Sequence, residues 1–135
     1  MTINIKTEIK SDIKYVWNCF TLPEHIVNWN FASADWKCPK AENDLKAGGK
    51  FNYRMEAEDG SFGFDFWGIY DEIIPYEKIA YTLGDNRKVE IRFKSEENSV
   101  IVEEDFDTED ENTVELQRAG WQAILDNFKK HAEKQ

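Results

Sequence analysis

The chain has 135 residues, 41% of them apolar, and a formal net charge of −10. This size and composition are typical of one soluble domain covering residues 1–135. The negative charge repels phosphate backbones and anionic lipids, so we expect neither nucleic acid nor a membrane surface among the partners. No apolar run approaches the roughly 20 residues of a membrane span, and the N-terminus lacks the apolar core of a signal peptide. We therefore expect a cytoplasmic protein.

The N-terminal segment predicts a strand followed by two short helices. Residues 3–10 alternate apolar and polar side chains, as a half-buried strand does. Ser11 suits an N-cap. The apolar residues behind it recur at the spacing of an amphipathic helix: Ile13, Val16, Trp17 and Phe20. Thr21 and Glu24 resemble a capping box for a second helix over Pro23–Trp29.

The middle of the chain alternates with period two and predicts six further strands. Pro39 cannot donate to a sheet ladder, so it indicates a strand end or an edge. Asp59-Gly60 is a strong hairpin signal, and other turn signals separate the remaining strands. The residues in the apolar phase are Trp36, Cys38, Phe51, Tyr53, Met55, Phe62, Phe64, Phe66, Tyr70, Ile79, Tyr81, Leu83, Val89, Ile91, Phe93, Val100, Val102, Glu104 and Phe106. Short turns between consecutive strands predict a largely antiparallel sheet.

The C-terminal segment predicts one long helix over Thr113–Glu133. The acidic stretch 105–112 precedes it, and Asn112 with Glu115 fits a capping box. One helical face carries Val114, Arg118, Trp121, Leu125 and Phe128. Only the concave face of a curved sheet offers this stripe a sufficient partner, so we predict an α+β fold. Gly120 costs about 1 kcal/mol relative to alanine, which indicates a close approach of the helix to a neighbour.

Four segments together resemble a known family. They are LPEHIVNWN, DLKAGGKFNYRMEAEDG, FWGIYDEIIPYEKIAYT and GWQAILDNF, and they span most of the chain. The sequence is similar to single-domain members of the family of activators of the ninety-kilodalton heat-shock protein ATPase, within the START-like or helix-grip superfamily. The resemblance implies a curved sheet of about six or seven strands around the long C-terminal helix, with a cavity between them. It also implies that many relatives bind apolar small molecules, while eukaryotic co-chaperones join such a domain to a separate N-terminal domain.

The space between sheet and helix has two interpretations. Aromatic residues make up 14% of the chain, and they either fill a solid core or line a ligand cavity. For the cavity, we predict the lining residues Tyr53, Met55, Phe64, Phe66, Phe93, Glu104, Arg118, Trp121 and Leu125. Arg118 either places its guanidinium at the rim or binds a ligand carboxylate or phosphate. A pairing with Glu104 would explain both residues, since a lone buried carboxylate is costly.

Catalytic and metal motifs are absent from the sequence. There is no nucleophile elbow, phosphate loop or HExxH motif, so we assign no catalytic residue. Cys19 and Cys38 suit a reducing compartment as free, buried thiols. Neither has a second cysteine or a histidine at metal-ligand spacing, so we expect no metal site and no cofactor. His25 and His131 are expected on the surface.

Three functional hypotheses follow. The first is a non-catalytic START-like domain that binds a small hydrophobic or amphipathic molecule. The second is a protein-interaction module, such as a chaperone accessory, that uses a sheet edge or the acidic surface. The third is a cyclase-like enzyme of the same superfamily, which requires an acid–base pair deep in the cavity. Arg118 and Glu104 are the only candidates for that pair.

Overall fold

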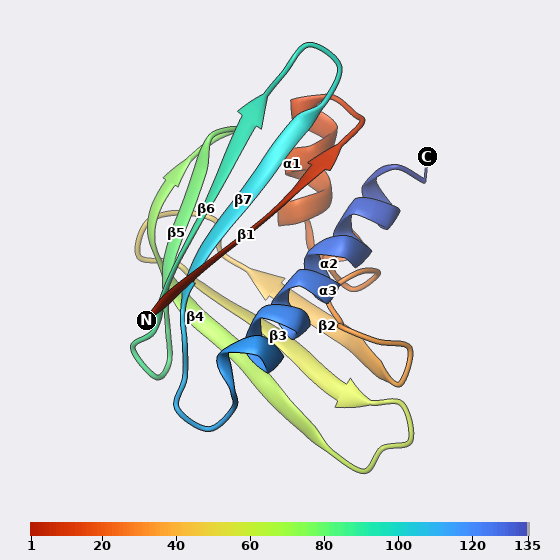
Figure 1. Cartoon of the computed structure of the whole chain (residues 1–135), viewed down its shortest axis with the longest axis vertical. Coiled ribbons are helices and arrows are strands. Elements are labelled where there is room, and N and C mark those ends of the chain that lie inside the picture. The colour runs from red at the N-terminus through yellow and green to blue at the C-terminus, as the bar shows by residue number, and fades with distance from the viewer. Residues whose placement is uncertain (135) are drawn as a thin grey trace.

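A curled seven-stranded sheet dominates the computed structural model, which describes residues 1–134 (Figure 1). The strands are β1 (Thr2–Ile9), β2 (Trp36–Asn43), β3 (Lys50–Ala57), β4 (Gly63–Ile74), β5 (Lys78–Leu83), β6 (Lys88–Ser95) and β7 (Val100–Asp107). All neighbours pair antiparallel in the spatial order β1-β7-β6-β5-β4-β3-β2. The predicted antiparallel sheet is therefore confirmed, and β1 and β2 form its two edges.

Three helices complete the fold, as the sequence predicts. They are α1 (Ile13–Thr21), α2 (Pro23–Ile26) and α3 (Val114–Ala132). The long helix α3 runs diagonally across the curled sheet, and α1 lies toward its C-terminal end (Figure 1). Along the way α3 contacts β1 and α1, while α2 packs against β2. The α+β class with a helix gripped by a curved sheet is thus confirmed.

The helix caps differ from those predicted. Asp12, not Ser11, caps α1, and Thr113, not Asn112, caps α3; each side chain accepts a backbone N–H three residues further on. The amide of Asn112 instead donates to Glu109 at 2.9 Å. Both predicted caps lie one residue too early, because several adjacent residues in each sequence are good capping types.

The second short helix is also shorter than predicted. It ends at Ile26, and its N-cap Leu22 makes no side-chain capping bond. Thr21 is the last residue of α1, and its hydroxyl donates to the carbonyl of Trp17 at 2.7 Å. The predicted capping box is therefore wrong, because this hydroxyl is bonded back to the preceding helical turn.

The strand β2, which contains Pro39, lies at an edge of the sheet and pairs irregularly with β3. Its register with β3 shifts between Lys37 and Lys40, the interval that contains Pro39. A residue without an N–H is tolerated at such an irregular edge. The edge prediction is therefore confirmed.

A solid aromatic core lies under the C-terminal half of α3. The ring of Phe128 meets those of Phe20 and Trp29 at centroid distances of 5.1 and 4.9 Å. Phe93 packs against Phe20 at 5.4 Å and against Trp17 at 5.1 Å. Both cysteines are buried and free, as predicted. Within residues 1–134, no helix combines the length and apolarity that a membrane span needs.

Candidate functional site

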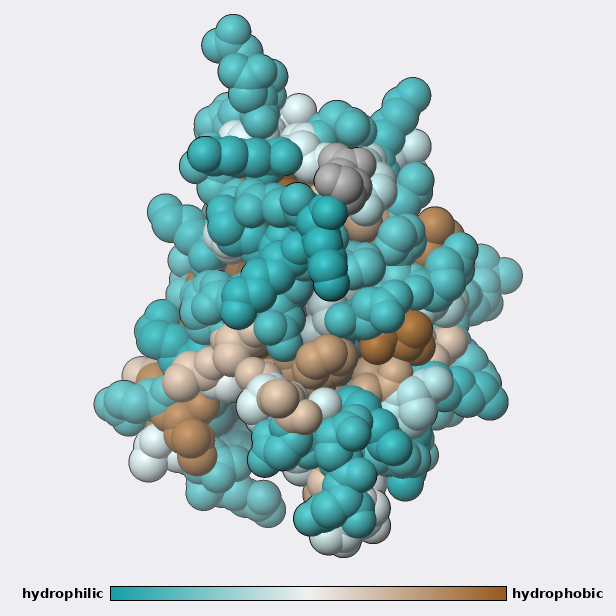
Figure 2. Space-filling model, turned by 90° about the vertical axis from the view of Figure 1, so that its right-hand side faces the viewer, coloured by the Kyte–Doolittle hydropathy of each residue, from teal (hydrophilic) through white to brown (hydrophobic). Residues whose placement is uncertain are grey.

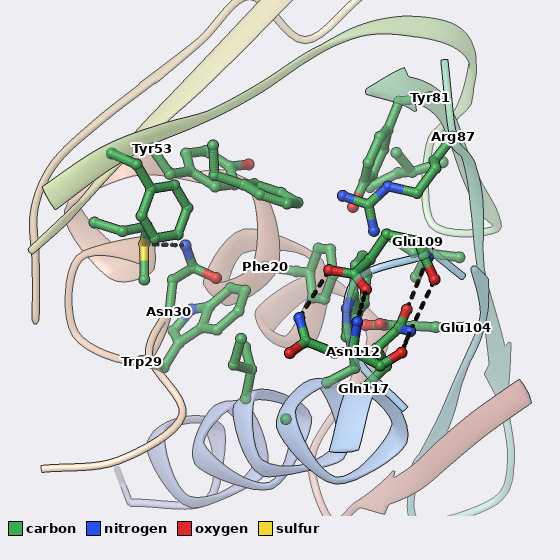
Figure 3. Close-up of a pocket in the computed structure, with 18 of the residues that line it drawn as sticks. Phe20, Trp29, Asn30, Tyr53, Tyr81, Arg87, Glu104, Glu109, Asn112 and Gln117 are labelled. Carbon is green, nitrogen blue, oxygen red and sulfur yellow. Dashed lines mark hydrogen bonds between the residues drawn. The ribbon is translucent and has the colours of Figure 1, made fainter. Parts of the chain in front are cut away.

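A cavity of about 640 Å³ lies between the concave face of the sheet and the N-terminal half of α3 (Figure 3). Strands β3 to β7 line it from one side, and residues of α3 line it from the other. Phe20 and Trp29 belong both to this lining and to the solid core. These two rings therefore form the wall at which close packing gives way to open space.

Aromatic rings make up the walls of the cavity. Trp121 of α3 faces inward, where it stacks on Phe106 with a centroid distance of 4.1 Å and meets Phe66 at 6.2 Å. Tyr53 stacks near Phe66 on the neighbouring strand at 6.4 Å. Rings held by ring–ring contacts of this kind give the cavity defined walls.

Three exposed apolar side chains form one part of the rim of the opening. Phe62 and Phe64 come from the β3–β4 hairpin and β4, and Leu116 comes from the first turn of α3. They are 61%, 42% and 60% exposed. On the face shown in Figure 2, apolar side chains gather in a band across the middle of a mostly polar surface. Three large apolar residues are thus exposed at one opening, which differs from the scattered single apolar residues usual on a protein surface.

Glu104 is the one acidic side chain in the inward-facing row of β7. Its residue is only 7% exposed, and it lies between the fully buried Val102 and Phe106. Among residues 1–134, no side chain forms a hydrogen bond or an ion pair with its carboxyl group. Burial raises the pKa of this carboxyl to about 8. Glu104 is therefore largely protonated at neutral pH and presents an O–H donor to the cavity.

Burial raises the pKa of two tyrosines that line the cavity, Tyr70 and Tyr81. Tyr70 donates its hydroxyl to Asn43 at 2.8 Å, and burial raises its pKa to about 12. The pKa of Tyr81 is raised well above its ordinary value, first by burial and then by the nearby charge of Glu104. Both phenols therefore remain neutral across the physiological range.

A polar network closes the end of the cavity where β7 leads into α3. The amide of Gln117 accepts from the N–H of Glu109 at 2.9 Å and donates to the carbonyl of Asn112 at 2.8 Å. Figure 3 shows Glu109 between Arg87 and the side chains of Asn112 and Gln117. The pKa of Glu109 is lowered, chiefly by the backbone N–H of Asn112. Its carboxylate therefore stays ionised at the rim.

The structure places six of the nine predicted lining residues at the cavity. They are Tyr53, Met55, Phe64, Phe66, Glu104 and Trp121. Phe93 and Leu125 are instead buried in the solid core. In the sheet, Ile91 pairs with Glu104 and lines the cavity, whereas Phe93 lies two residues further along β6 and reaches α1. Both residues face inward as expected, but they lie beyond the wall of the cavity.

Arg118 lies outside the cavity, contrary to prediction. It is exposed, and its guanidinium donates to the carbonyl of Asn4 at 3.0 Å. Gln122 and Lys129, on the same side of α3, reach the carbonyls of Lys6 and Glu8. These three side chains satisfy alternate carbonyls along the free edge of β1, which protects an edge strand from pairing with another chain.

The predicted pairing of Arg118 with Glu104 is therefore wrong. One side chain reaches out over the edge of β1, while the other is enclosed beneath α3. The acid–base pair that a cyclase-like reaction requires is not formed by these two residues.

Sequence reasoning missed a second stripe on α3. Gln117, Gly120 and Ile124 all line the cavity, and their spacing of three and four residues is itself a helical signal. A Cβ built at Gly120 would meet nothing within 4 Å. The predicted close approach at Gly120 is therefore wrong, because this glycine borders open space.

The chain matches a known protein family over most of its length. The family model described as "Activator of Hsp90 ATPase homolog 1-like protein" matches residues 10–133. The chain belongs to this family. No curated protein matches it.

Solved structures agree with the family assignment. The solution structure of the AHSA1-like protein from Aeromonas hydrophila is 40% identical, with a TM-score of 0.94, over 99% of this chain and 93% of that one. A protein from Cytophaga hutchinsonii is 44% identical, with a TM-score of 0.86, over 98% and 92% of the two chains. A protein from Chromobacterium violaceum, 22% identical over 96% and 95% of the chains with a TM-score of 0.86, shares the fold.

Proposed function

We propose that this family member is a non-catalytic, cytoplasmic domain that binds one small, mostly apolar molecule between the sheet and α3. The observation that carries the proposal is Glu104, a largely buried carboxyl group to which no side chain of residues 1–134 bonds, in a cavity with aromatic walls. The cavity volume of about 640 Å³ is within the usual range for small-molecule sites. The Glu104 carboxyl borders this cavity, so a ligand atom there would supply a hydrogen bond that no side chain of residues 1–134 supplies.

The charges around the cavity favour a neutral or cationic ligand over an anion. A protonated Glu104 donates to a ligand hydroxyl or carbonyl, and an amine would instead stabilise its ionised form. Glu109 and Glu111 add carboxylates at the rim. Arg87 is engaged by Asp85 at 2.8 Å, and Arg118 points away. A fatty-acid carboxylate would therefore lie near acidic groups, without an unpaired arginine to offset their repulsion.

A headgroup series tests this preference. Dodecanol, dodecylamine and dodecanoate share one chain, and each is titrated against the neutral dye Nile red bound to the full-length protein. We expect the alcohol and the amine to displace the dye, and dodecanoate to displace it at least tenfold less effectively. Failure of all three ligands and of the dye to bind would overturn the proposal.

Gly120 supplies a matched pair of variants. Because its Cβ position faces open space, Gly120→Phe should place a ring in the cavity and abolish dye binding. Gly120→Ala adds one methyl group and should leave binding intact. Equal dye affinity in the two variants would show that the dye binds elsewhere.

A second candidate is a chaperone accessory, which the printed description of the family favours. The exposed Phe62, Phe64 and Leu116 offer an apolar contact surface next to the cavity. This candidate predicts that the protein changes the ATPase rate of the Hsp90 from its own host. A triple substitution of these rim residues by serine should abolish the change. An unchanged rate with a saturating excess of the unmodified protein would contradict it.

A further inference from the structure

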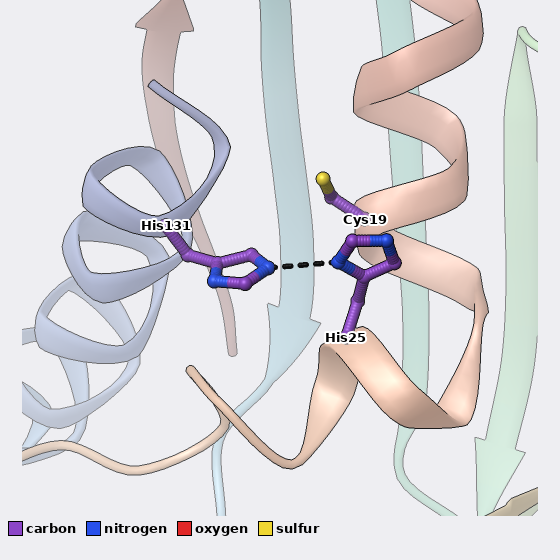
Figure 4. Close-up of side chains that lie close together, drawn as sticks. All are labelled: Cys19, His25 and His131. Carbon is purple, nitrogen blue, oxygen red and sulfur yellow. Dashed lines mark hydrogen bonds between the residues drawn. The ribbon is translucent and has the colours of Figure 1, made fainter. Parts of the chain in front are cut away.

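A cysteine and two histidines from three helices converge near the C-terminal end of α3 (Figure 4). Cys19 comes from α1, His25 from α2 and His131 from the last turn of α3. The Cys19 sulfur and one nitrogen of each ring all lie within 4.8 Å of one another. Both histidines are half-buried, so each keeps part of its side chain at the surface as predicted, while the two rings pack against each other.

The two imidazoles face each other directly. Nδ1 of His25 lies 2.9 Å from Nε2 of His131, and the ring planes are inclined at 70°. A hydrogen bond at this distance requires one N–H and one lone pair, so at least one of the facing nitrogens is unprotonated. An unprotonated imidazole nitrogen is a metal ligand. The sulfur of Cys19 lies beside this pair and is fully buried.

The donor set and its dimensions fit zinc. Zinc is bound in proteins by thiolate and imidazole at about 2.3 and 2.0–2.1 Å in tetrahedral geometry. Those bond lengths place the ligand atoms about 3.3–3.6 Å apart. The facing nitrogens would separate slightly from 2.9 Å, and the remaining ligand atoms, all within 4.8 Å, would move closer by about an ångström. Side-chain rotation supplies movements of this size.

We propose that Cys19, His25 and His131 bind one Zn²⁺ ion, with a fourth position open to water or a small ligand. On binding, a Zn–S bond replaces the S–H bond of Cys19, and the thiol proton leaves to solvent. The N–H between the two histidines moves to the other nitrogen of its ring, so both facing nitrogens become ligands. The ion enters from the side of the half-buried imidazoles, because the sulfur is enclosed.

The site would link elements that are distant in the sequence. Cys19 and His131 are separated by most of the chain, and the ion would tie the end of α3 to α1 and α2. The ring of Tyr15 packs edge-on against that of His25 at a centroid distance of 6.1 Å. Tyr15 thus helps to orient one of the three ligands. Sequence spacing gave no sign of this site because the third ligand is supplied by the other end of the chain.

Cobalt provides the direct test. The full chain, free of any histidine tag, is titrated with Co²⁺ under reducing conditions. We expect one equivalent to produce visible bands of tetrahedral cobalt and a thiolate-to-cobalt charge-transfer band, and one equivalent of Zn²⁺ to remove both. A spectrum of octahedral cobalt without the charge-transfer band would overturn the proposal.

Matched variants locate the bound ion. Cys38→Ser alters the other buried free cysteine and should leave the cobalt spectrum unchanged. Cys19→Ser should remove the charge-transfer band, and His131→Gln should weaken Zn²⁺ binding at least tenfold. Because Cys19 is fully buried, its variant could fail to fold, and the half-buried His131 then carries the test. Zn²⁺ should raise the melting temperature of the unmodified protein but not of His131→Gln. An equal rise in both would also overturn the site.

Discussion

The two halves of α3 face the same sheet, yet one borders a cavity and the other a solid core. In the N-terminal half, Gln117, Gly120 and Trp121 border the open space. In the C-terminal half, Leu125, Phe128 and Ala132 are almost fully buried. A glycine, an amide and a tryptophan turned flat against Phe106 leave volume unfilled, whereas Phe128 meets two rings at once.

This contrast separates stability from binding along one helix. Close-packed interiors stabilise a fold, because each buried carbon makes many contacts. A cavity gives up those contacts to leave room for a ligand. The C-terminal half of α3 therefore anchors the helix to the sheet, and under the proposed function the N-terminal half would contact the small molecule.

The largest expected effect lies in the solid half. Phe128→Ala should lower the free energy of unfolding by about 3–5 kcal/mol, the usual cost of truncating a buried phenylalanine. Trp121→Ala should cost less, since its ring already borders open space. Urea denaturation of the two variants measures the difference. Equal losses would show that the two halves contribute alike and would remove the contrast.

Glu104 should give stability an unusual pH dependence. Its pKa in the folded protein is about 8, above the ordinary value near 4.3 in an unfolded chain. Between these values the folded state holds the proton and the unfolded state has lost it, so stability falls as pH rises. The slope from this group is at most about 1.4 kcal/mol per pH unit. Tyr81 titrates above this window.

Glu104→Gln isolates this contribution. The free energy of unfolding of the variant and of the unmodified protein is measured from pH 5 to pH 8, about the window set by the two pKa values. As the pH rises, the variant should become steadily more stable relative to the unmodified protein. Surface carboxylates such as Glu103 and Asp105, with lowered pKa values, cancel in the comparison. A difference that does not change with pH would contradict the raised pKa of the buried Glu104 carboxyl.

The smallest expected effect concerns two glycines. Gly120→Ala should stabilise the protein by about 1 kcal/mol, because alanine is the better helix former and its methyl group meets nothing within 4 Å. Gly68→Ala should destabilise it, because a Cβ there would lie 2.8 Å from the Thr82 carbonyl oxygen and 2.9 Å from the Phe51 ring. Thermal unfolding of both variants measures the effects. Destabilisation by Gly120→Ala would indicate a filled space beside α3.

Much of the fold was determined by the sequence alone. Alternation with period two in segments such as Val89–Phe93 predicts strands, and turn pairs such as Asp59-Gly60 predict their antiparallel order. The stripe through Trp121 and Phe128 predicts a long helix against the sheet. These signals are local, since each depends only on which side of one element is apolar.

Only the tertiary structure decided what the inward-facing residues meet. Phe93 and Ile91 carry the same strand signal, yet Phe93 is in the core and Ile91 lines the cavity. Arg118 fits the inward stripe by spacing but reaches the edge of β1. Cys19, His25 and His131 share no spacing pattern and meet only in space. The curvature of the sheet and the crossing angle of α3 set these relations, and both arise from packing among many residues at once.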